Sequence, residues 1–343
     1  MPQHEDGHRP ETSRHRALVT VIGESLVDII DDPRRGGSRP EAHPGGSPLN
    51  VAVGCARLDL RTNLVTHFAD DPHGLMIAGH LADNGVGAIV GGSLPTSTAV
   101  ASLDPVGAAQ YMFAISWDID GACRPALASV EGSIHVHTGS IASVLPPGNA
   151  SVRGLIAASR AHATISYDPN CRPAVMQDAA DARRQVEDLV AASDIVKASD
   201  EDLCWLYPDR SQEESMAAWL DLGPALIVLT RGADGPVILA RAGCVQMPGE
   251  SITVADTVGA GDSFMAALIS GLAQLKALGA PARERLHALN RQDLQALAAY
   301  ANKAAAITCS RPGANPPSTR ELGSMADGGV AHSAGAPTVS YRA

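Results

Sequence analysis

The sequence predicts an α/β fold in which a doubly wound, mostly parallel sheet is covered by helices on both faces. Short apolar runs alternate with longer, alanine-rich runs, which is the pattern of a parallel sheet with helical crossovers. The apolar runs are nearly continuous, as expected of strands that are buried on both faces. The chain has 343 residues, of which 45% are hydrophobic, and this suits one large core.

The first half of the chain begins with the run Leu18–Ile22, which is short and rich in β-branched residues and therefore predicts a strand. Alanine-rich runs predict helices at about 48–59 and 74–84. The run Ser133–His137 predicts the next strand of the sheet, and a helix is expected after it at about 149–161.

The second half continues the alternation. Three strands are expected, each bounded by Gly, Pro, Asn or Asp: Thr164–Tyr167, Asp194–Lys197 and Leu226–Leu229. The helices expected between and after them lie at about 180–192, 213–221, 260–275 and 291–308. Because ligands of such sheets bind beyond the carboxyl ends of the strands, residues that follow each strand are candidates for a site.

Two segments do not fit the alternation and predict a small β lid over the site. Residues 31–44 are polar and rich in Gly, Pro and Arg. Residues 97–115 hold two alternating runs joined by Asp104-Pro105-Val106-Gly107, which is a hairpin signal. A single domain with a lid is the simplest account of this pattern.

The two ends of the chain differ in composition from the rest. Residues 1–16 and 323–343 are expected to be disordered tails around one folded domain at 17–322.

The composition limits the classes of partner and location that are expected. A net charge of −11 argues against a broad nucleic-acid or anionic-membrane surface. The six cysteines lack zinc spacing, and no apolar run has the length of a membrane span or the form of a signal peptide. We therefore expect a cytoplasmic protein without nucleic-acid or membrane partners.

The stretch Gly259-Ala260-Gly261-Asp262 stands where the helix at 260–275 begins. Glycine and alanine leave backbone N–H groups at a helix N-terminus open to an anion. A carboxylate in such a turn would repel a phosphate that is merely bound. It fits phosphoryl transfer, in which the carboxylate takes a proton from the attacking hydroxyl. The alternative interpretation is an ordinary helix start with Asp262 as its cap.

Five further motifs stand where site residues of such a sheet are expected. In chain order they are Gly23-Glu24-Ser25-Leu26-Val27-Asp28, Gly45-Gly46-Ser47-Pro48-Leu49-Asn50, Asp168-Pro169-Asn170-Cys171-Arg172-Pro173, Lys197-Ala198-Ser199-Asp200-Glu201-Asp202 and Thr230-Arg231-Gly232-Ala233-Asp234-Gly235. Together with Gly259–Asp262 they resemble the ribokinase-like family of sugar kinases, and within it the fructokinase branch. The resemblance runs from about Val19 to Glu321. It implies a doubly wound α/β domain with a β lid and ATP-dependent phosphorylation of a sugar hydroxyl. The fructokinase branch favours fructose as that sugar.

In that resemblance Asp262 is the catalytic base. The amides of Gly259, Ala260 and Gly261 form the anion hole for the γ-phosphoryl group that is transferred. The lid closes over the sugar and excludes water, which limits wasteful hydrolysis of ATP.

The resemblance also identifies the sugar side of the site. Asp28 grips sugar hydroxyls, Gly45 and Gly46 let the backbone approach the sugar, and Asn50 hydrogen-bonds to it. Many relatives carry a lysine after the two glycines, where this chain has Ser47-Pro48. No cation stands there to meet a substrate phosphate, which favours a neutral sugar.

Asn170 and Arg172 are further expected contacts to substrate or phosphate. They follow the strand at 164–167, where chemistry is expected in this kind of sheet. An Arg–Asp pair that merely fixes the loop explains them nearly as well.

The resemblance assigns the ATP side to a second set of residues, which are Lys197, Ser199, Thr230, Gly232, Gly235 and Asn302. For the segment 197–202 the alternative is a helix N-cap with an acidic first turn. For 230–235 it is a hairpin turn, and for Asn302 a packing or surface residue.

Two metals are implied. Mg²⁺ bridges the β- and γ-phosphates, and Asp202 organises it through water. A monovalent cation such as K⁺ is expected near Asp256 and Val258. The chain departs from the family pattern at both places: Ser199 and Asp202 replace an Asn-x-x-Glu motif, and Pro317 stands where relatives can offer a hydroxyl.

Three alternatives stay open at this point. The sugar could be 2-keto-3-deoxygluconate, ribose or a nucleoside, and Arg172 is the candidate cation for the carboxylate of a keto acid. The chain could instead be a catalytically silent relative that binds sugar or nucleotide as a regulator, although the intact Asp262 argues against this. A homodimer through the lid strands is a further alternative to a monomer.

Overall fold

The computed structural model describes residues 17–31, 40–103 and 109–325. The expected tail at 1–16, most of the tail expected at 323–343, the middle of the 31–44 segment and the expected turn at 104–107 lie outside the described residues. Within the described residues, no helix is long and apolar enough to cross a membrane.

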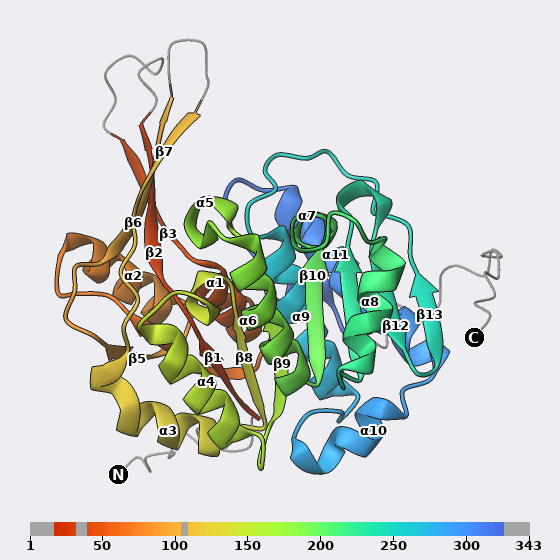
Figure 1. The fold of residues 1–343 in the computed structure, drawn as a ribbon. Coiled ribbons are helices and arrows are strands. Elements are labelled where there is room, and N and C mark those ends of the chain that lie inside the picture. The colour runs from red at the N-terminus through yellow and green to blue at the C-terminus, as the bar shows by residue number, and fades with distance from the viewer. Residues whose placement is uncertain (1–16, 32–39, 104–108, 326–343) are drawn as a thin grey trace, which may run out of the picture.

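A nine-stranded sheet runs through the middle of the molecule in the order β13-β12-β11-β10-β9-β8-β1-β4-β5 (Figure 1). The seven strands from β5 to β11 pair in parallel, whereas β12 and β13 add an antiparallel edge. Their bounds are β1 (Leu18–Ile22), β4 (Arg61–His67), β5 (Gly87–Gly91), β8 (His135–Gly139), β9 (Thr164–Asp168), β10 (Ile195–Ser199), β11 (Leu226–Thr230), β12 (Val237–Ala240) and β13 (Gly243–Gln246). The predicted mostly parallel sheet is confirmed.

The order of the strands reverses beside β1, which has β4 on one side and β8 on the other. The chain first builds outwards from β1 to β5 and then returns to β8 and builds the other way. The carboxyl ends of β1 and β8 therefore border a crevice at the switch point, where ligands of doubly wound sheets bind.

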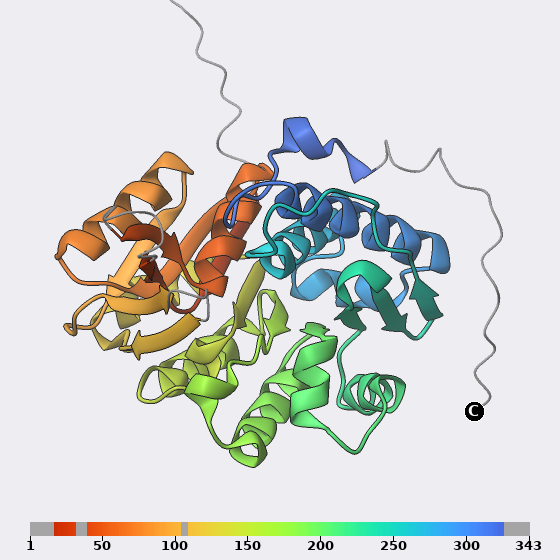
Figure 2. The same cartoon turned by 90° about the horizontal axis from the view of Figure 1, so that it is seen from above.

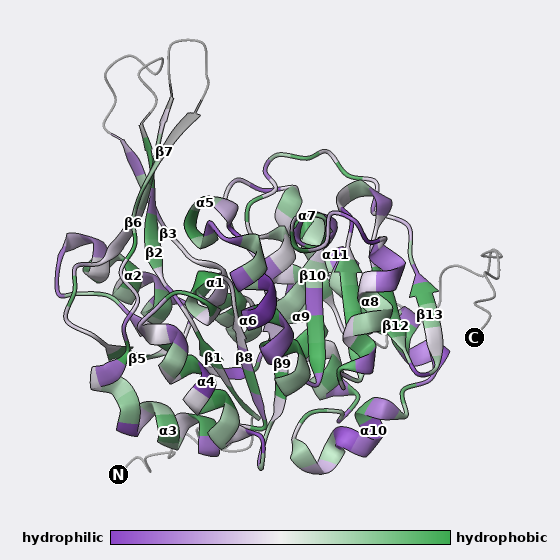
Figure 3. Cartoon of the chain, in the orientation of Figure 1, coloured by the Kyte–Doolittle hydropathy of each residue, from purple (hydrophilic) through white to green (hydrophobic). Residues whose placement is uncertain are grey.

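Helices cover both faces of the sheet, as the view from above shows (Figure 2). One face is covered by α1 (Ser47–Arg57), α2 (Pro72–Asp83), α9 (Ala260–Gln274), α10 (Arg283–His287) and α11 (Arg291–Cys309), whose apolar residues share one core cluster. The other face is covered by α3 (Cys123–Glu131), α4 (Gly148–Ser159), α6 (Ala179–Ala192), α7 (Asp200–Leu206) and α8 (Gln212–Asp221), which form two clusters. Two short helices, α5 (Pro173–Met176) and α12 (Thr319–Leu322), are also present. The hydropathy colours show apolar strands between these layers (Figure 3).

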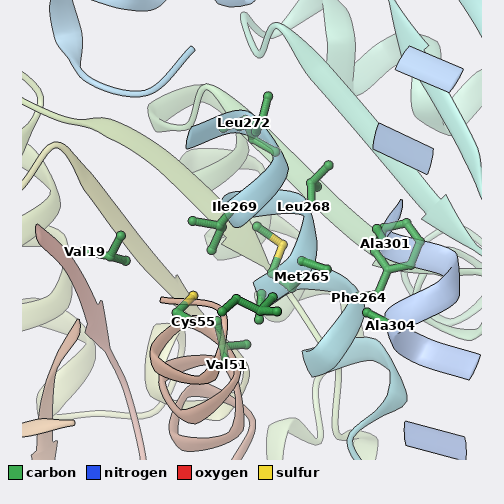
Figure 4. Packing of buried hydrophobic residues seen from close by; sticks show 14 of the residues in the cluster. Val19, Val51, Cys55, Phe264, Met265, Leu268, Ile269, Leu272, Ala301 and Ala304 are labelled. Atoms are coloured by element: carbon green, nitrogen blue, oxygen red, sulfur yellow. The ribbon is translucent and has the colours of Figure 1, made fainter. Parts of the chain in front are cut away.

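Helix α9 lies between α1 and α11 in the largest core cluster (Figure 4). Phe264, Met265 and Leu268 on α9 are at most 1% exposed. A β-carbon on Gly54 of α1 would lie only 2.6 Å from the β-carbon of Ala266, so the two helices approach as closely as small residues allow. This contact holds α1 against α9 about two turns into each helix.

The second sheet is the predicted lid, with strand order β3-β2-β6-β7. Its strands are β2 (Leu26–Asp31), β3 (Glu41–Gly45), β6 (Ser97–Leu103) and β7 (Ala109–Ala114), and they rise beyond the main sheet (Figure 1). The hairpin predicted within 97–115 is confirmed as the antiparallel pair β6–β7. The lid also contains β2, which the sequence did not predict as a strand and which pairs in parallel with β6.

Strands β4 and β5 were also not predicted, because β4 mixes polar with apolar residues. Two of these polar side chains are buried and make hydrogen bonds: the Thr66 hydroxyl pairs with that of Ser25 at 2.9 Å, and His67 Nδ1 lies 2.6 Å from the carbonyl oxygen of Gly91, although His67 Nε2 is buried without a partner among the described residues. A polar residue is tolerated in a buried strand when its hydrogen bonds are satisfied.

Candidate active site

A cleft of about 890 Å³ lies between the carboxyl ends of the central strands and the lid. Loops after β1, β9, β10 and β11, the first turns of α1 and α9, and residues of α11 and the lid line it. All of the site residues expected from the sequence line this cleft except Gly45 and Asp256. Motifs from the whole length of the chain therefore meet in one site.

Asp262 is the third residue of α9 and is 8% exposed. The helix is capped by Gly259, whose φ of 74° and close approach to Ala314 both require glycine. The Asp262 side chain does not cap its own helix. Its Oδ1 accepts a hydrogen bond from the Ser47 hydroxyl at 2.6 Å, and its Oδ2 accepts one from Asn50 Nδ2 at 2.8 Å. The interpretation of Asp262 as a simple helix cap is wrong.

The two glycines before α1, Gly45 and Gly46, allow the chain to pack closely against Asp28 and Glu24. Gly46 has a φ of 107°, and a β-carbon there would lie 2.6 Å from the carbonyl oxygen of Glu24. A β-carbon on Gly45 would lie 2.1 Å from Asp28 Oδ2. Gly45 thus leaves room for the Asp28 carboxylate and does not itself face the cleft.

Asp28 projects into the cleft from lid strand β2. Burial raises the pKa of its carboxyl, while the charges of Arg172 and His43 lower it. Arg172 therefore lies close enough to influence Asp28 electrostatically. Its guanidinium donates to the carbonyl oxygen of Cys171 at 3.0 Å, within its own loop.

Lys197, which lines the cleft, belongs to a buried ion pair. Lys197 Nζ lies 2.7 Å from Asp168 Oδ2, and the two side chains are 4% and 1% exposed. Burial lowers the pKa of Lys197, but the charges of Asp168, Asp202 and Asp262 outweigh burial and hold this pKa above its usual value. The ammonium lies 3.0 Å from where a β-carbon on Gly261 would stand, so it lies behind the first turn of α9.

This pairing corrects one expectation about the Asp168–Pro173 loop. The Arg–Asp pair considered for that loop is not formed by Arg172 with Asp168, because Asp168 pairs with Lys197 instead. Asn170 and Arg172 both line the cleft, and Asn170 adopts a φ of 36°, a conformation that asparagine tolerates better than most residues.

Ser199 and Asp202 form the helix cap that was the alternative interpretation of their segment. The Ser199 hydroxyl accepts from the Asp202 amide at 3.1 Å, and Asp202 Oδ2 accepts from the Ser199 amide at 2.8 Å. Asp202 Oδ1 also accepts from the Cys171 amide at 2.6 Å. Asp202 therefore ties the loops after β9 and β10 together while it lines the cleft.

The far end of the cleft is lined by Thr230, Gly232, Gly235 and Asn302. Thr230 to Gly235 joins β11 to the antiparallel strand β12, so the expected turn is present. Asn302 Nδ2 donates to the carbonyl oxygen of Pro248 at 3.0 Å, which holds the loop after β13 against α11.

Asp256 does not reach the cleft. Its carboxylate accepts from the amides of Val258 at 3.0 Å and Gly313 at 2.9 Å, so it fastens its own loop to the segment after α11. Across the part of the chain that the structure describes, no group of three or more His, Cys, Asp and Glu side chains could hold a metal ion. A divalent ion in this cleft would need phosphate oxygens among its ligands, as Mg²⁺ commonly has.

Two residues of the site were not assigned from the sequence. Glu24 lines the cleft and accepts from the Ala142 amide at 3.1 Å. Burial raises the pKa of Glu24 to about 7, against the opposing effect of hydrogen bonds from Ser140 and the backbone. Ser47 lines the cleft and contacts Asp262. The position of Glu24 after the first strand was a signal for its role, whereas the sequence marked Ser47 only as the residue that replaces a lysine.

Known proteins are similar to this chain over most of its length. The family model described as pfkB family carbohydrate kinase matches residues 16–321. The chain is 32% identical to fructokinase-1 of Oryza sativa over 313 residues, which is 87% of this chain and 94% of that protein. It is 31% identical to a fructokinase of Rhizobium leguminosarum over 261 residues, covering 74% and 79% of the two chains. A crystal structure of a Vibrio cholerae fructokinase double mutant with fructose, ADP and potassium ion superposes with a TM-score of 0.72 at 26% identity, covering 89% of this chain and 97% of that one.

Proposed function

The chain belongs to the pfkB family of carbohydrate kinases, and on that premise we propose that it transfers the γ-phosphoryl group of ATP to a hydroxyl of fructose. One observation carries the proposal. Asp262 lines the same cleft as the residues at the start of α9 and as Asp28 and Asn50, which can hold a sugar, and it accepts a hydrogen bond from Asn50. A base in that position reaches an acceptor hydroxyl and the phosphoryl group at once.

In the proposed reaction, Asp28 accepts hydrogen bonds from sugar hydroxyls and Asn50 offers its amide oxygen, because its nitrogen already donates to Asp262. Asn170 and Arg172 complete the sugar side. Asp262 takes the proton of the acceptor hydroxyl as its oxygen bonds to the γ-phosphorus, and the bond from that phosphorus to the β-phosphate oxygen breaks to release ADP. The amides of Gly259, Ala260 and Gly261 stabilise the charge on the transferring group.

ATP is proposed to extend from the start of α9 along the cleft. The residues assigned to its side are Lys197, Ser199, Thr230, Gly232, Gly235 and Asn302, all of which line the cleft. Lys197 supplies positive charge close to the anion hole.

Mg²⁺ fits this arrangement, because phosphate oxygens and water would hold it, and Asp202 is the carboxylate proposed to organise it through water. It would neutralise charge on the β- and γ-phosphates. A monovalent cation such as K⁺ near Asp256 and Val258 is also proposed. The carbonyl oxygens of that loop are suitable ligands, while the Asp256 carboxylate is already engaged by two amides.

The lid is proposed to close over the sugar. Its strand β2 carries Asp28, and Ala99 on β6 and Phe113 on β7 line the cleft. Closure would exclude water and bring Asp28 against the sugar. Met112 on β7 of the lid is 64% exposed, which supports a homodimer through the lid as the proposed assembly. Light scattering after gel filtration tests it.

A cytoplasmic location is proposed with this activity. All six cysteines are free, as expected in a reducing compartment that also supplies ATP.

A panel of sugars tests the function directly. ADP release is measured with fructose, ribose, 2-keto-3-deoxygluconate and a nucleoside, and the phosphorylated product is identified by mass spectrometry. The proposal predicts the highest kcat/KM for fructose. A preference for the keto acid would identify Arg172 as a carboxylate ligand and overturn the fructose assignment. Binding of sugar and ATP without turnover would instead indicate a silent, regulatory relative.

A further inference from the structure

We propose that Ser47 is a positioning residue for the catalytic base. Its hydroxyl, together with the Asn50 amide, holds the Asp262 carboxylate in the orientation in which it meets the acceptor hydroxyl. The inference rests on the proposed function, because it gives Ser47 a role only through Asp262. The sequence showed Ser47 merely as the replacement of a lysine.

The contact geometry supports this role. Ser47 and Asn50 are the first and fourth residues of α1 and lie on the same side of its first turn. Each one engages a different oxygen of Asp262, at 2.6 Å from the Ser47 hydroxyl and 2.8 Å from Asn50 Nδ2. The terminal torsion of an aspartate is soft, so two donors on its two oxygens fix an orientation that one donor would leave free.

The surroundings make these hydrogen bonds effective. Ser47 and Asp262 are each 8% exposed, so little water competes for the carboxylate. Hydrogen bonds to an ionised group are shorter and stronger than those between neutral groups. These two hydrogen bonds, which we call the clamp, therefore hold the orientation of Asp262, whereas Lys197 acts on it only through its charge.

The clamp leaves Asp262 able to act as a base. Each carboxylate oxygen can accept two hydrogen bonds, so an acceptor hydroxyl can donate to Asp262 while Ser47 and Asn50 stay in place. The Ser47 proton remains on its own oxygen throughout, because the proton that Asp262 takes comes from the sugar.

Ser47 has no competing role as a helix cap. The cap of α1 is Gly46, which makes no side-chain hydrogen bond to the helix. The close contact of Gly54 with Ala266 holds α1 against α9, so the position of Ser47 beside Asp262 is set by helix packing.

The clamp also connects the base to the sugar side of the cleft. Lid strand β3 ends at Gly45, only two residues before Ser47, and Gly45 packs against Asp28. Ser47, which orients the base, therefore lies in one short stretch of chain with Asn50 and with the glycine that packs against Asp28.

The test compares four variants by steady-state kinetics. Ser47→Ala removes the hydroxyl. Ser47→Thr keeps the hydroxyl and adds a methyl group, and Ser47→Val has the same bulk as threonine but no hydroxyl. Ser263→Ala is the control, because it removes a buried hydroxyl beside Asp262 that bonds to Thr308 and does not line the cleft.

We expect Ser47→Ala and Ser47→Val to lower kcat by about tenfold, the effect of losing one charge-assisted hydrogen bond, with KM for sugar and ATP within about twofold. Ser47→Thr and Ser263→Ala should keep kcat within about threefold of the wild type. A kcat for Ser47→Ala within about twofold of the wild type would overturn the proposal. So would equal kcat values for the threonine and valine variants.

A double variant separates positioning from any other effect. In an Asp262→Ala background, Ser47→Ala should cause no further fall in kcat, because the group it orients is gone. A further tenfold fall there would show that Ser47 acts elsewhere and would overturn the proposal. An inactive wild type would refute the proposed function along with this inference, whereas a fully active Ser47→Ala enzyme refutes this inference alone.

Discussion

The ammonium nitrogen of Lys197 lies 3.0 Å from the point at which a β-carbon on Gly261 would stand. The cation and the first turn of α9 are thus in direct contact only because residue 261 lacks a side chain. Lys197 is also held by Asp168 at 2.7 Å and is almost fully buried, so it has little freedom to move aside.

Gly261→Ala tests this contact. The added methyl group would press on the ammonium and on the phosphate that α9 receives, so we expect kcat to fall by at least about tenfold. Gly154→Ala is the matched control, because a β-carbon on this exposed helical glycine meets nothing within 4 Å. It should keep full activity and gain up to about 1 kcal/mol of stability. Steady-state kinetics and thermal unfolding measure both, and an active Gly261→Ala enzyme would contradict the account of the contact.

Lys197→Met tests the buried ion pair. It leaves the Asp168 charge buried without its partner, which should lower the free energy of unfolding by about 3–5 kcal/mol. Adding Asp168→Asn removes the charge and should restore most of that loss, but not the activity. Urea unfolding of the two variants at neutral pH measures this. Equal destabilisation in the single and the double variant would argue against an ion-pair effect.

Glu24→Gln tests the pH dependence of stability. Burial raises the pKa of Glu24 to about 7, from an ordinary value of 4.5. A raised carboxyl pKa contributes stability that is present below pH 4.5 and is lost as the pH rises through about 7. Relative to the wild type, the variant should therefore gain stability between pH 5 and pH 8, on the order of a few kcal/mol. Urea unfolding at the two pH values measures it, and the same difference at both would show that Glu24 does not titrate in this range.

Asp28→Asn tests the sugar side. The amide replaces one acceptor oxygen by a donor, so sugar hydroxyls lose a charge-assisted contact while the ATP side is untouched. We expect KM for fructose to rise about tenfold or more, and KM for ATP to stay within about twofold. Arg172 and His43 lie near enough to lower the pKa of Asp28, so some change in their contacts is expected too. An unchanged KM for fructose would remove Asp28 from the site.

The parallel core could be predicted from the sequence because its strands are short apolar runs between helical runs. The predicted helices at 48–59 and 260–275 correspond to α1 and α9 within two residues at each end. Strand β4 could not be predicted, because polar residues such as Thr66 are buried there through hydrogen bonds that only the folded chain provides. Lid strand β2 was missed because it follows β1 so closely that it resembled a loop.

The candidate site was predicted by motif, but its contacts were not. Asp262 and Asn50 were both expected in the site, yet their hydrogen bond joins residues 212 positions apart. Such a contact depends on how α1 packs against α9, and no local pattern records it. The same holds for Asp202, whose two oxygens join the loops after β9 and β10.

The role of Asp262 as the base is the central claim, and Asp262→Asn tests it most directly. The amide keeps the shape of the side chain but cannot take the proton of the acceptor hydroxyl. The measurement is kcat with fructose, together with the affinity for ATP from calorimetry and the thermal midpoint as a check on folding. We expect a fall in kcat of about 10² to 10⁴ with ATP affinity unchanged. A folded Asp262→Asn enzyme that turns over at a rate near that of the wild type would contradict it.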